Sequence, residues 1–324
     1  MKHKFVTANG LKFCYDEFGD PDRPAMLLIM GLGTQMIAWP EPFCERLAAG
    51  GFRVIRFDNR DIGLSEGLNS EPVPNLPILA VASRFGLRLR VPYTLQDMKS
   101  DTVALLDELD IGRAHLVGAS MGGMIAHLAA SEHPDRVASM TAMMSTSGAR
   151  HLPGPPADVR RHLISAPPPD EDRYVERRMR TLELVGSRTY PADRDVLRER
   201  LRAAYRRSFR PEGYMRQLAA VIASGDRVAA LRRIRVPTLV IHGDEDRLVP
   251  PAASEHIARL VPNSRLEIIE GMEGVTGKKF DDEKFINAVN WAAMPLDVAS
   301  APDPFSSEAT RSSKTAVVGL LIRV

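Results

Sequence analysis

The segment AHLVGASMGGMIAHLAA occupies residues 114–130. It begins with a short apolar run, continues through glycines on both sides of Ser120, and ends in an alanine-rich apolar pattern. A short apolar run bounded by glycine is typical of a buried strand, whereas the alanine-rich part is typical of a helix. The sequence therefore predicts a strand at residues 114–117, a sharp turn at residues 118–122, and a helix that begins at once.

Gly118 and Gly122 flank Ser120 in the spacing G-x-S-x-G. A strained turn from strand to helix brings the backbone close to itself, so the neighbours of the serine need to lack bulky side chains. The turn projects the hydroxyl at the N-terminus of a helix, where free N–H groups and the helix dipole favour a developing negative charge. An ordinary glycine turn is the alternative. The flanking strand and helix patterns favour a nucleophile elbow.

Length and composition limit the function classes. With 324 residues, the chain can form one large α/β domain with an insertion and a buried core. The formal net charge of +2 argues against a dedicated nucleic-acid surface. Two cysteines, Cys14 and Cys44, provide neither a disulfide framework nor a metal-ligand cluster. We therefore expect no cofactor, no metal and no nucleic-acid partner.

The sequence carries no targeting or membrane signal that we recognise. The first ten residues, MKHKFVTANG, contain no apolar run of the kind found in signal peptides. No stretch approaches the ~18 apolar residues needed to span a membrane. We expect a cytoplasmic protein without a membrane partner, and the sequence gives no indication of its oligomeric state.

Strand and helix patterns alternate along most of the chain. Besides the strand before Ser120, strands are expected at residues 4–7, 11–17, 26–30, 52–57, 137–144, 237–242 and 265–269. Besides the helix after Ser120, helices are expected at residues 41–49, near 78–85, at 95–109 and at 252–260. This alternation predicts an α/β fold with a mostly parallel, doubly wound sheet, whose ligands bind beyond the carboxyl ends of the strands.

Residues 147–234 differ in character from the segments on either side. They are rich in arginine and proline and contain the helical charge patterns ERRMR and RERLRAAYRR. Because they lie between two expected strands, we interpret them as an inserted helical cap over a core of residues 1–146 and 235–292. The arginine runs could form an anion-binding surface, but mixed arginine and glutamate are more typical of solvated helix faces.

Four segments, in the correct order, resemble the α/β-hydrolase superfamily. The most informative of the four is the nucleophile-elbow segment GASMGG, residues 118–123. Residues 30–33, MGLG, resemble the H-G-x-x oxyanion segment, and residues 58–65 resemble D-x-R-G-x-G-x-S with Asp61 replacing a glycine. Residues 242–250, HGDEDRLVP, resemble H-G-x-x-D-x-x-V-P. Within this superfamily, the segments GLGTQMIAWP (residues 31–40) and NRDIGLSEG (residues 59–67) most resemble the esterase branch that includes aclacinomycin methylesterase-like proteins.

The resemblance implies a role for several residues. Ser120 would be the nucleophile of a carboxylic ester hydrolase that forms an acyl-enzyme, and Asp246 would be the acid that orients a histidine. The backbone N–H groups of Leu32 and Met121 would form the oxyanion hole, where each donor contributes about 2.7–4 kcal/mol to the barrier. Asp244 is the rival acid, although it matches a variable position. The expected partner is a small-molecule ester, whose identity the cap sequence does not reveal.

One family residue is missing. The family's histidine follows the last strand, often as G-M-G-H, whereas this chain has Gly271-Met272-Glu273-Gly274 and no histidine after His256. A serine hydroxyl needs a base within hydrogen-bond reach. Glu273 is a possible substitute base, with a solvated loop residue as the alternative reading. His242 precedes the acid loop and is expected to be structural.

Two functions therefore remain open. The first is a cap-bearing serine carboxylesterase, and the second is a catalytically impaired α/β-hydrolase-fold protein that binds a small ligand without efficient turnover. A triad without its base retains about 10³–10⁴-fold catalysis over water, so weak esterase activity fits both. The sequence after Glu273 also departs from the family, and residues 293–324, rich in proline, serine, alanine and aspartate, are predicted to be disordered.

Overall fold

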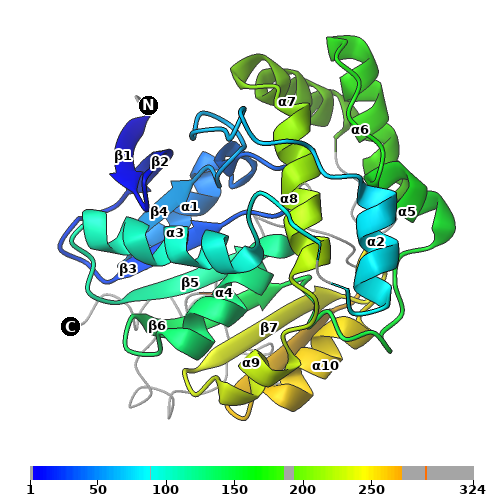
Figure 1. The fold of residues 1–324 in the computed structure, drawn as a ribbon. Helices are drawn as coiled ribbons and strands as arrows, with labels where there is room; N and C mark the ends of the chain where they lie inside the picture. The colour runs from blue at the N-terminus through cyan, green and yellow to red at the C-terminus, as the bar shows by residue number, and fades with distance from the viewer. Residues whose placement is uncertain (1–2, 88, 186–192, 272–288, 290–324) are drawn as a thin grey trace.

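The computed structural model describes residues 3–87, 89–185, 193–271 and 289, and its centre is a sheet of eight strands within that part of the chain (Figure 1). The strands are β1 (Lys4–Ala8), β2 (Leu11–Phe18), β3 (Ala25–Ile29), β4 (Arg53–Phe57), β5 (Ala114–Ala119), β6 (Val137–Met143), β7 (Thr238–Gly243) and β8 (Ser264–Ile269). Their order is β1-β2-β4-β3-β5-β6-β7-β8. Only the pairs β1–β2 and β2–β4 are antiparallel, which confirms the predicted mostly parallel sheet.

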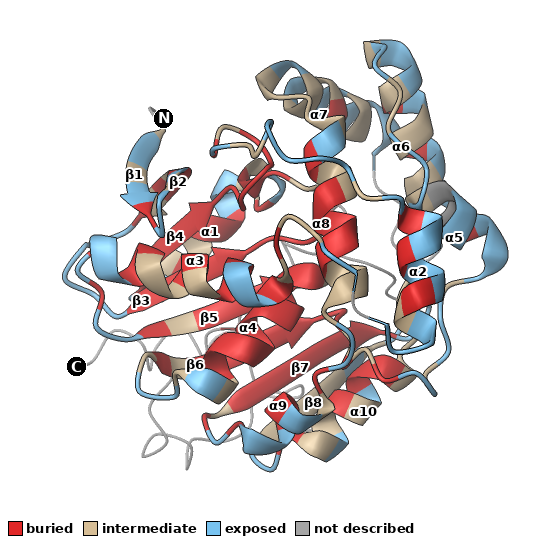
Figure 2. Cartoon of the chain, in the orientation of Figure 1, coloured by how far each residue is buried: buried red, intermediate tan, exposed pale blue. Residues whose placement is uncertain are grey.

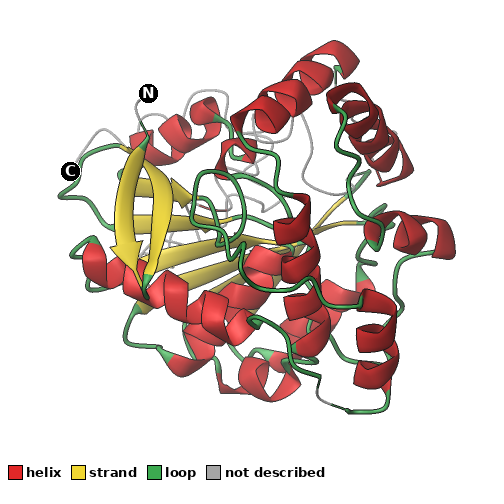
Figure 3. Ribbon diagram, turned by 45° about the horizontal axis from the view of Figure 1, so that its top comes forward, coloured by secondary structure: helices red, strands yellow, loops and turns green. Residues whose placement is uncertain are grey.

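Helices cover the sheet on both faces (Figure 3). They are η1 (Met36–Ala38), α1 (Glu41–Ala49), α2 (Leu76–Arg84), α3 (Leu95–Glu108), α4 (Met121–Glu132), α5 (Ala157–Leu163), α6 (Glu171–Val185), α7 (Arg194–Arg207), α8 (Pro211–Ala223), α9 (Val228–Arg233) and α10 (Ala252–Leu260). Apolar residues of α3, α4, α9 and α10 share one core cluster, and those of α1 belong to the cluster on the opposite face. None of the described helices is long and apolar enough to cross a membrane.

The middle strands are buried on both faces, as Figure 2 shows. All five residues of β3 are buried, and they alternate between the two core clusters. Leu27 and Ile29 pack with α3 and α4, whereas Met26 and Leu28 pack with α1. The continuous apolar run of this strand follows from burial on both sides. The fold thus places the ends of β3, β5 and β7 together at one edge of a rigid core.

Helices α5 to α9 lie between β6 and β7 in the chain, and they do not all pack in the same place. Helix α6 packs against α7, and α8 packs against α2 (Figure 1). The loop after β3 donates from the Gly33 amide to Gln217 of α8, at 2.9 Å. The loop after β4 accepts at the Gly63 carbonyl from Ser208, at 2.7 Å. Helices α7 and α8 therefore lie beyond the carboxyl ends of these strands.

Helix α9 packs differently from its neighbours in the chain. It lies against α4 and α10, and its Ala230 and Leu231 belong to the main core cluster. The predicted helix near residues 78–85 is α2, which begins after Asn75, whose side chain accepts from the Ile78 amide at 3.2 Å. The tail predicted to be disordered, residues 293–324, falls outside the described residues.

His127 of α4 is fully buried, and neither of its ring nitrogens has a hydrogen-bond partner in the described structure. Burial, together with the nearby charge of Arg227, lowers the pKa of His127 to about 3. The ring is therefore neutral in the folded protein at neutral and mildly acidic pH. In the unfolded chain its pKa returns to about 6.5.

We expect the substitution His127→Leu to reduce the loss of stability in acid. The unfolded state binds more protons than the folded state below about pH 6.5, so this histidine destabilises the fold as the pH falls toward 3. At pH 5 the effect is about 2 kcal/mol, since each pKa unit corresponds to 1.36 kcal/mol. Urea unfolding at pH 8 and pH 5 measures it. Equal acid losses in the native chain and the variant would contradict this account.

Candidate active site

Ser120 lies in a strained turn between β5 and α4. Its φ of 51° and ψ of −114° are unusual for a residue with a side chain. The Ser120 amide donates to the Met143 carbonyl at 2.7 Å, and the Ser120 carbonyl accepts from the Ser145 hydroxyl at 2.8 Å. The strand was predicted to end at residue 117, but β5 continues to Ala119, where it still pairs with Met143 of β6. The turn between strand and helix is therefore shorter than the predicted turn at residues 118–122.

The two glycines of the motif are required by close backbone contacts. A Cβ atom at Gly118 would lie 2.3 Å from the Gly122 carbonyl oxygen. A Cβ atom at Gly122 would lie 2.0 Å from the Ile29 carbonyl oxygen at the end of β3. Both contacts are with backbone that cannot move aside, so no side chain fits at either position. The elbow geometry expected from G-x-S-x-G is present.

The loop after β3 passes directly beside Ser120. A Cβ atom at Gly31 would lie 3.2 Å from the serine Cβ and 3.8 Å from its Oγ. The loop is held by Asn59, whose side chain donates to the Met30 carbonyl at 3.0 Å. Among the described residues, the amides of Leu32 and Met121 donate in none of the turn, loop and cap hydrogen bonds. Their role as the oxyanion donors stays a prediction.

Asp246 follows β7, which is separated from β5 by β6 alone. Its side chain is buried, and its Oδ1 accepts from the amides of Leu248 and Val249, at 2.8 and 2.9 Å. The rival Asp244 is exposed. Of the two candidate acids, Asp246 is the one whose carboxylate is buried and held in place by backbone amides.

His242 is engaged within the acid loop. Its Nε2 lies 2.6 Å from the Val249 carbonyl, to which it donates, and 3.3 Å from Asp246 Oδ2. Its Nδ1 lies 2.6 Å from the Ser254 hydroxyl. Because the carbonyl requires a proton on Nε2, a neutral ring accepts from Ser254 at Nδ1. Both nitrogens have structural partners, which agrees with the interpretation of His242 as a structural residue.

Among the described side chains, no histidine forms a hydrogen bond with the Ser120 hydroxyl, and other histidines have partners elsewhere. His115 lies in β5 and its Nδ1 is 2.9 Å from the Ser139 hydroxyl. His256 is 2.8 Å from the Ser147 hydroxyl and stacks edge-on against His151, with ring centroids 4.8 Å apart. Glu273 and Gly274, at the position of the family's histidine, lie outside the described residues.

Neither cysteine competes with Ser120 as a nucleophile. Cys14 and Cys44 are buried free thiols, and burial raises the pKa of each to about 12. A thiol with such a pKa stays protonated at neutral pH and is inert. Within the described residues, no group of three or more histidine, cysteine, aspartate or glutamate side chains is arranged to hold a metal ion.

The role of Asp61 is a feature that the sequence does not reveal. Its φ is 70°, which keeps the glycine-like conformation of the family's motif. Its two carboxylate oxygens accept from Arg216 of α8, each at 2.8 Å, and from the Tyr93 hydroxyl at 2.8 Å. Burial alone would raise the pKa of Asp61, but these hydrogen bonds and that from the Leu68 amide hold it below its usual value. Asp61 thus attaches α8 to the core.

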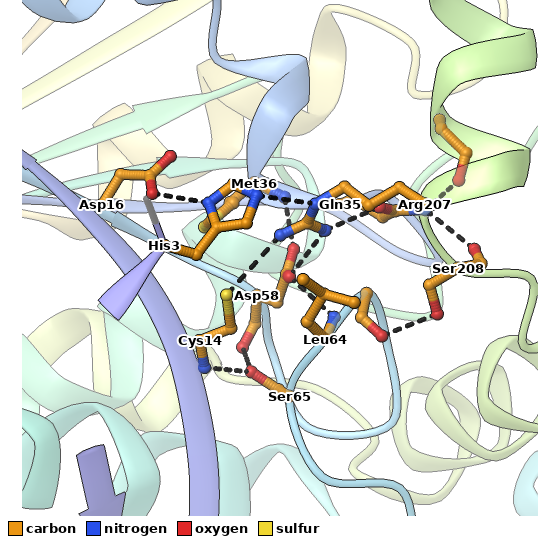
Figure 4. A network of polar contacts seen from close by, with 12 residues as sticks. His3, Cys14, Asp16, Gln35, Met36, Asp58, Leu64, Ser65, Arg207 and Ser208 are labelled. Atoms are coloured by element: carbon orange, nitrogen blue, oxygen red, sulfur yellow. Dashed lines mark hydrogen bonds and ion pairs between the residues drawn. The ribbon is translucent and has the colours of Figure 1, made fainter. Parts of the chain in front are cut away.

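Asp58 attaches the end of α7 in a similar way (Figure 4). Its Oδ2 lies 2.8 Å from an Nη of Arg207, and its Oδ1 accepts from the Met36 amide at 2.8 Å. Arg207 also donates to Gln35, at 2.7 Å, and Gln35 donates to the Ser208 carbonyl at 2.9 Å. The loops after β3 and β4 are therefore fixed to the helices above them by buried charges.

Comparison with known proteins agrees with this geometry. Residues 24–273 match the family described as alpha/beta hydrolase fold. The chain belongs to the α/β-hydrolase family. The expected recognition and fold class are thereby confirmed. The enol-lactonase of Burkholderia xenovorans LB400 shares the fold with a TM-score of 0.67 and 23% identity, covering 89% of this chain and 99% of that one.

Known relatives match most of the chain. Rhodomycin D methylesterase DauP of Streptomyces sp. (strain C5) is 29% identical over 293 residues, covering 84% of this chain and 92% of the relative. Poly(3-hydroxyalkanoate) depolymerase of Ectopseudomonas oleovorans is 29% identical, covering 78% of each. The esterase RhEst1 of Rhodococcus sp. ECU1013 has a TM-score of 0.68 at 20% identity, covering 93% and 99% of the two chains, which shows the fold alone.

We expect Asp61→Gly to destabilise the fold by about 3–5 kcal/mol, although glycine suits the backbone at this position. The substitution leaves Arg216, whose side chain is 3% exposed, without its carboxylate. The double substitution Asp61→Gly/Arg216→Met should recover most of the loss, because it removes both buried charges. Urea unfolding measures both effects.

The surface pair of Arg198 and Glu176 provides the control for this experiment. Removing it with Arg198→Ala should change stability by less than about 1 kcal/mol. If Asp61→Gly behaves like this surface variant, then the carboxylate does not attach α8 to the core.

Proposed function

We propose that this chain is a serine hydrolase that cleaves small-molecule carboxylic esters through an acyl-enzyme on Ser120. The observation that carries the proposal is the strained Ser120 turn, with the Gly31 backbone packed beside its side chain. Relatives that include methylesterases support ester cleavage as the reaction class. No cofactor is required for this chemistry.

The proposed reaction uses the arrangement described above. Ser120 Oγ attacks the ester carbonyl carbon and gives its proton to a base. The carbonyl oxygen becomes an oxyanion that accepts from the amides of Leu32 and Met121. Collapse of this intermediate breaks the ester bond, and the departing alkoxide takes the proton. Water then releases the acid from the acyl-enzyme by the reverse steps, and Asp246 orients the base throughout.

We further propose that α5 to α8 of the insertion at residues 147–234 act as a cap on the core of residues 1–146 and 235–292, with α9 of the insertion packed into that core. The buried pairs of Asp58 with Arg207 and of Asp61 with Arg216 support this assignment, since they attach helices of this segment to loops beside Ser120. A cap in this position would bound the substrate and set its shape.

A specific observation favours a second candidate, a catalytically impaired member of the family that binds a ligand. No histidine follows His256 in the sequence, and Gly274 takes the position of the family's base. Glu273 is the one carboxylate of that loop segment that could replace it. The amides of Leu32 and Met121 would still bind the carbonyl oxygen of an ester or of its product.

We expect the native chain to hydrolyse a short-chain p-nitrophenyl ester and to be labelled by a fluorophosphonate. Ser120→Ala should abolish labelling and lower turnover at least 100-fold, because it removes the nucleophile. Ser131→Ala, in the same helix, is the matched control and should change neither. Release of p-nitrophenol and gel fluorescence measure the two effects.

The variant Gly274→His separates the two candidates. Efficient turnover in the native chain that requires Ser120 supports the esterase. Turnover that becomes efficient only in Gly274→His supports the impaired protein. Ester hydrolysis that persists unchanged in Ser120→Ala would show that Ser120 is not the nucleophile.

A further inference from the structure

A pocket lies between the core loops and the helices above them, beside the candidate active site. On the core side it is lined by Gly33 and Gly63, and Gly33 is two residues from Gly31, which packs on Ser120. On the other side it is lined by residues of α6, α8 and the segment between α7 and α8. Its volume of about 60 Å³ exceeds the roughly 10–15 Å³ that one water needs, so it can take a small group of atoms.

The charge of this pocket is positive. Its lining includes Arg177, Arg178 and Arg210 and, among the described residues, no aspartate or glutamate. Arg178 forms no ion pair in the described structure, and its Nε is buried without a hydrogen-bond partner. Arg210 donates to the Ser208 hydroxyl at 3.3 Å and likewise has no acidic partner in that part of the chain. A buried guanidinium N–H without an acceptor is costly.

Several arginines of the neighbouring helix α7 have acidic partners. Arg198 lies 2.8 Å from Glu176, and Arg202 lies 2.7 Å from Asp172. Arg206 pairs in the same way with a glutamate at the start of α6. The surface arginines therefore match the predicted solvated faces. Arg178 and Arg210 differ from these α7 arginines, because neither has an acidic partner among the described residues.

The pKa values of Arg177 and Tyr214, which both line the pocket, are shifted by the positive charge around them. Burial lowers the pKa of Arg177, and the adjacent Arg178 charge lowers it further, against an opposing effect of Tyr214. Burial raises the pKa of Tyr214, while both arginines act to lower it. An anion bound here would relieve the repulsion between the two guanidinium groups.

We propose that this pocket binds a free carboxylate of the substrate, so that the ester cleaved at Ser120 is a half ester of a dicarboxylic acid. A guanidinium presents donors in a planar fork that matches a carboxylate. The rings of Tyr174 and Phe209, which line the same pocket with centroids 5.6 Å apart, would contact the short apolar chain between the two carboxyl groups. This inference rests on the proposed function, because it names the substrate class of that site.

The test compares charged and neutral esters of equal size. The monomethyl esters of succinic, glutaric and adipic acid are each paired with the neutral ω-amide, and kcat/KM is measured in a pH-stat. We expect Arg178→Gln to lower kcat/KM at least about tenfold for the preferred half ester, as expected for a lost charge-assisted hydrogen bond, and less than about twofold for its amide. Arg180→Gln, at an exposed position on the same helix, is the matched control and should change neither.

Equal losses on the half ester and its amide would overturn the proposal, since a merely structural role of Arg178 affects both. Circular dichroism melting of each variant checks the fold. A native chain that prefers the neutral amides would overturn the proposal as well.

A binding measurement keeps this test separate from the proposed function. Ser120→Ala retains the pocket, so glutarate titrated into it calorimetrically should bind, and Arg178→Gln in the same background should weaken binding at least about tenfold. Glutarate binding without any ester cleavage by the native chain would refute the esterase but keep the pocket. Ester cleavage without glutarate binding would refute the pocket alone. Tighter binding of inorganic phosphate than of glutarate would overturn the assignment to a carboxylate.

Discussion

The close approach of three backbone segments at the ends of β3 and β5 constrains the rest of this structure. Gly122 lies against the Ile29 carbonyl and Gly118 lies against Gly122, so neither position accepts a side chain. Ser120 between them is held in a left-handed conformation. Because helix α4 begins immediately after the serine, its first amides and the loop after β3 converge on one point. The site is therefore a consequence of how the central strands end.

Buried carboxylate–arginine pairs hold helices α7 and α8 in place above the loops beside Ser120. Asp61 and Arg216 are 155 positions apart in the chain, yet their hydrogen bonds unite a core loop with α8. Such pairs require extensive desolvation, and an apolar contact of the same size would often be as stable. Their directionality orients α7 and α8 relative to the loops beside Ser120, which a purely apolar contact would specify less closely.

Local features were predictable from the sequence, and long-range ones were not. The apolar run of β3 and the G-x-S-x-G turn each depend on neighbours within a few residues. The partner of Asp61 depends on how α8 docks, and no local pattern encodes it. Likewise, the run ERRMR favoured a solvated face, but Arg178 and Arg180 lie about 200° apart around the helix, so one lines the pocket and the other is exposed.

Ser120 and Asp246, the two predicted catalytic residues, are not equally informative about whether the chain is an active esterase. Asp246 has a structural use, since it accepts from two amides of its own loop and lies next to His242. Its presence therefore fits an impaired protein as well as an enzyme. Ser120 has no such use for its side chain: a glycine would adopt a φ of 51° without the roughly 1–3 kcal/mol of strain that a serine incurs there. A strained residue whose hydroxyl stabilises nothing in the described structure is better explained by chemistry at that hydroxyl, and this asymmetry favours the esterase.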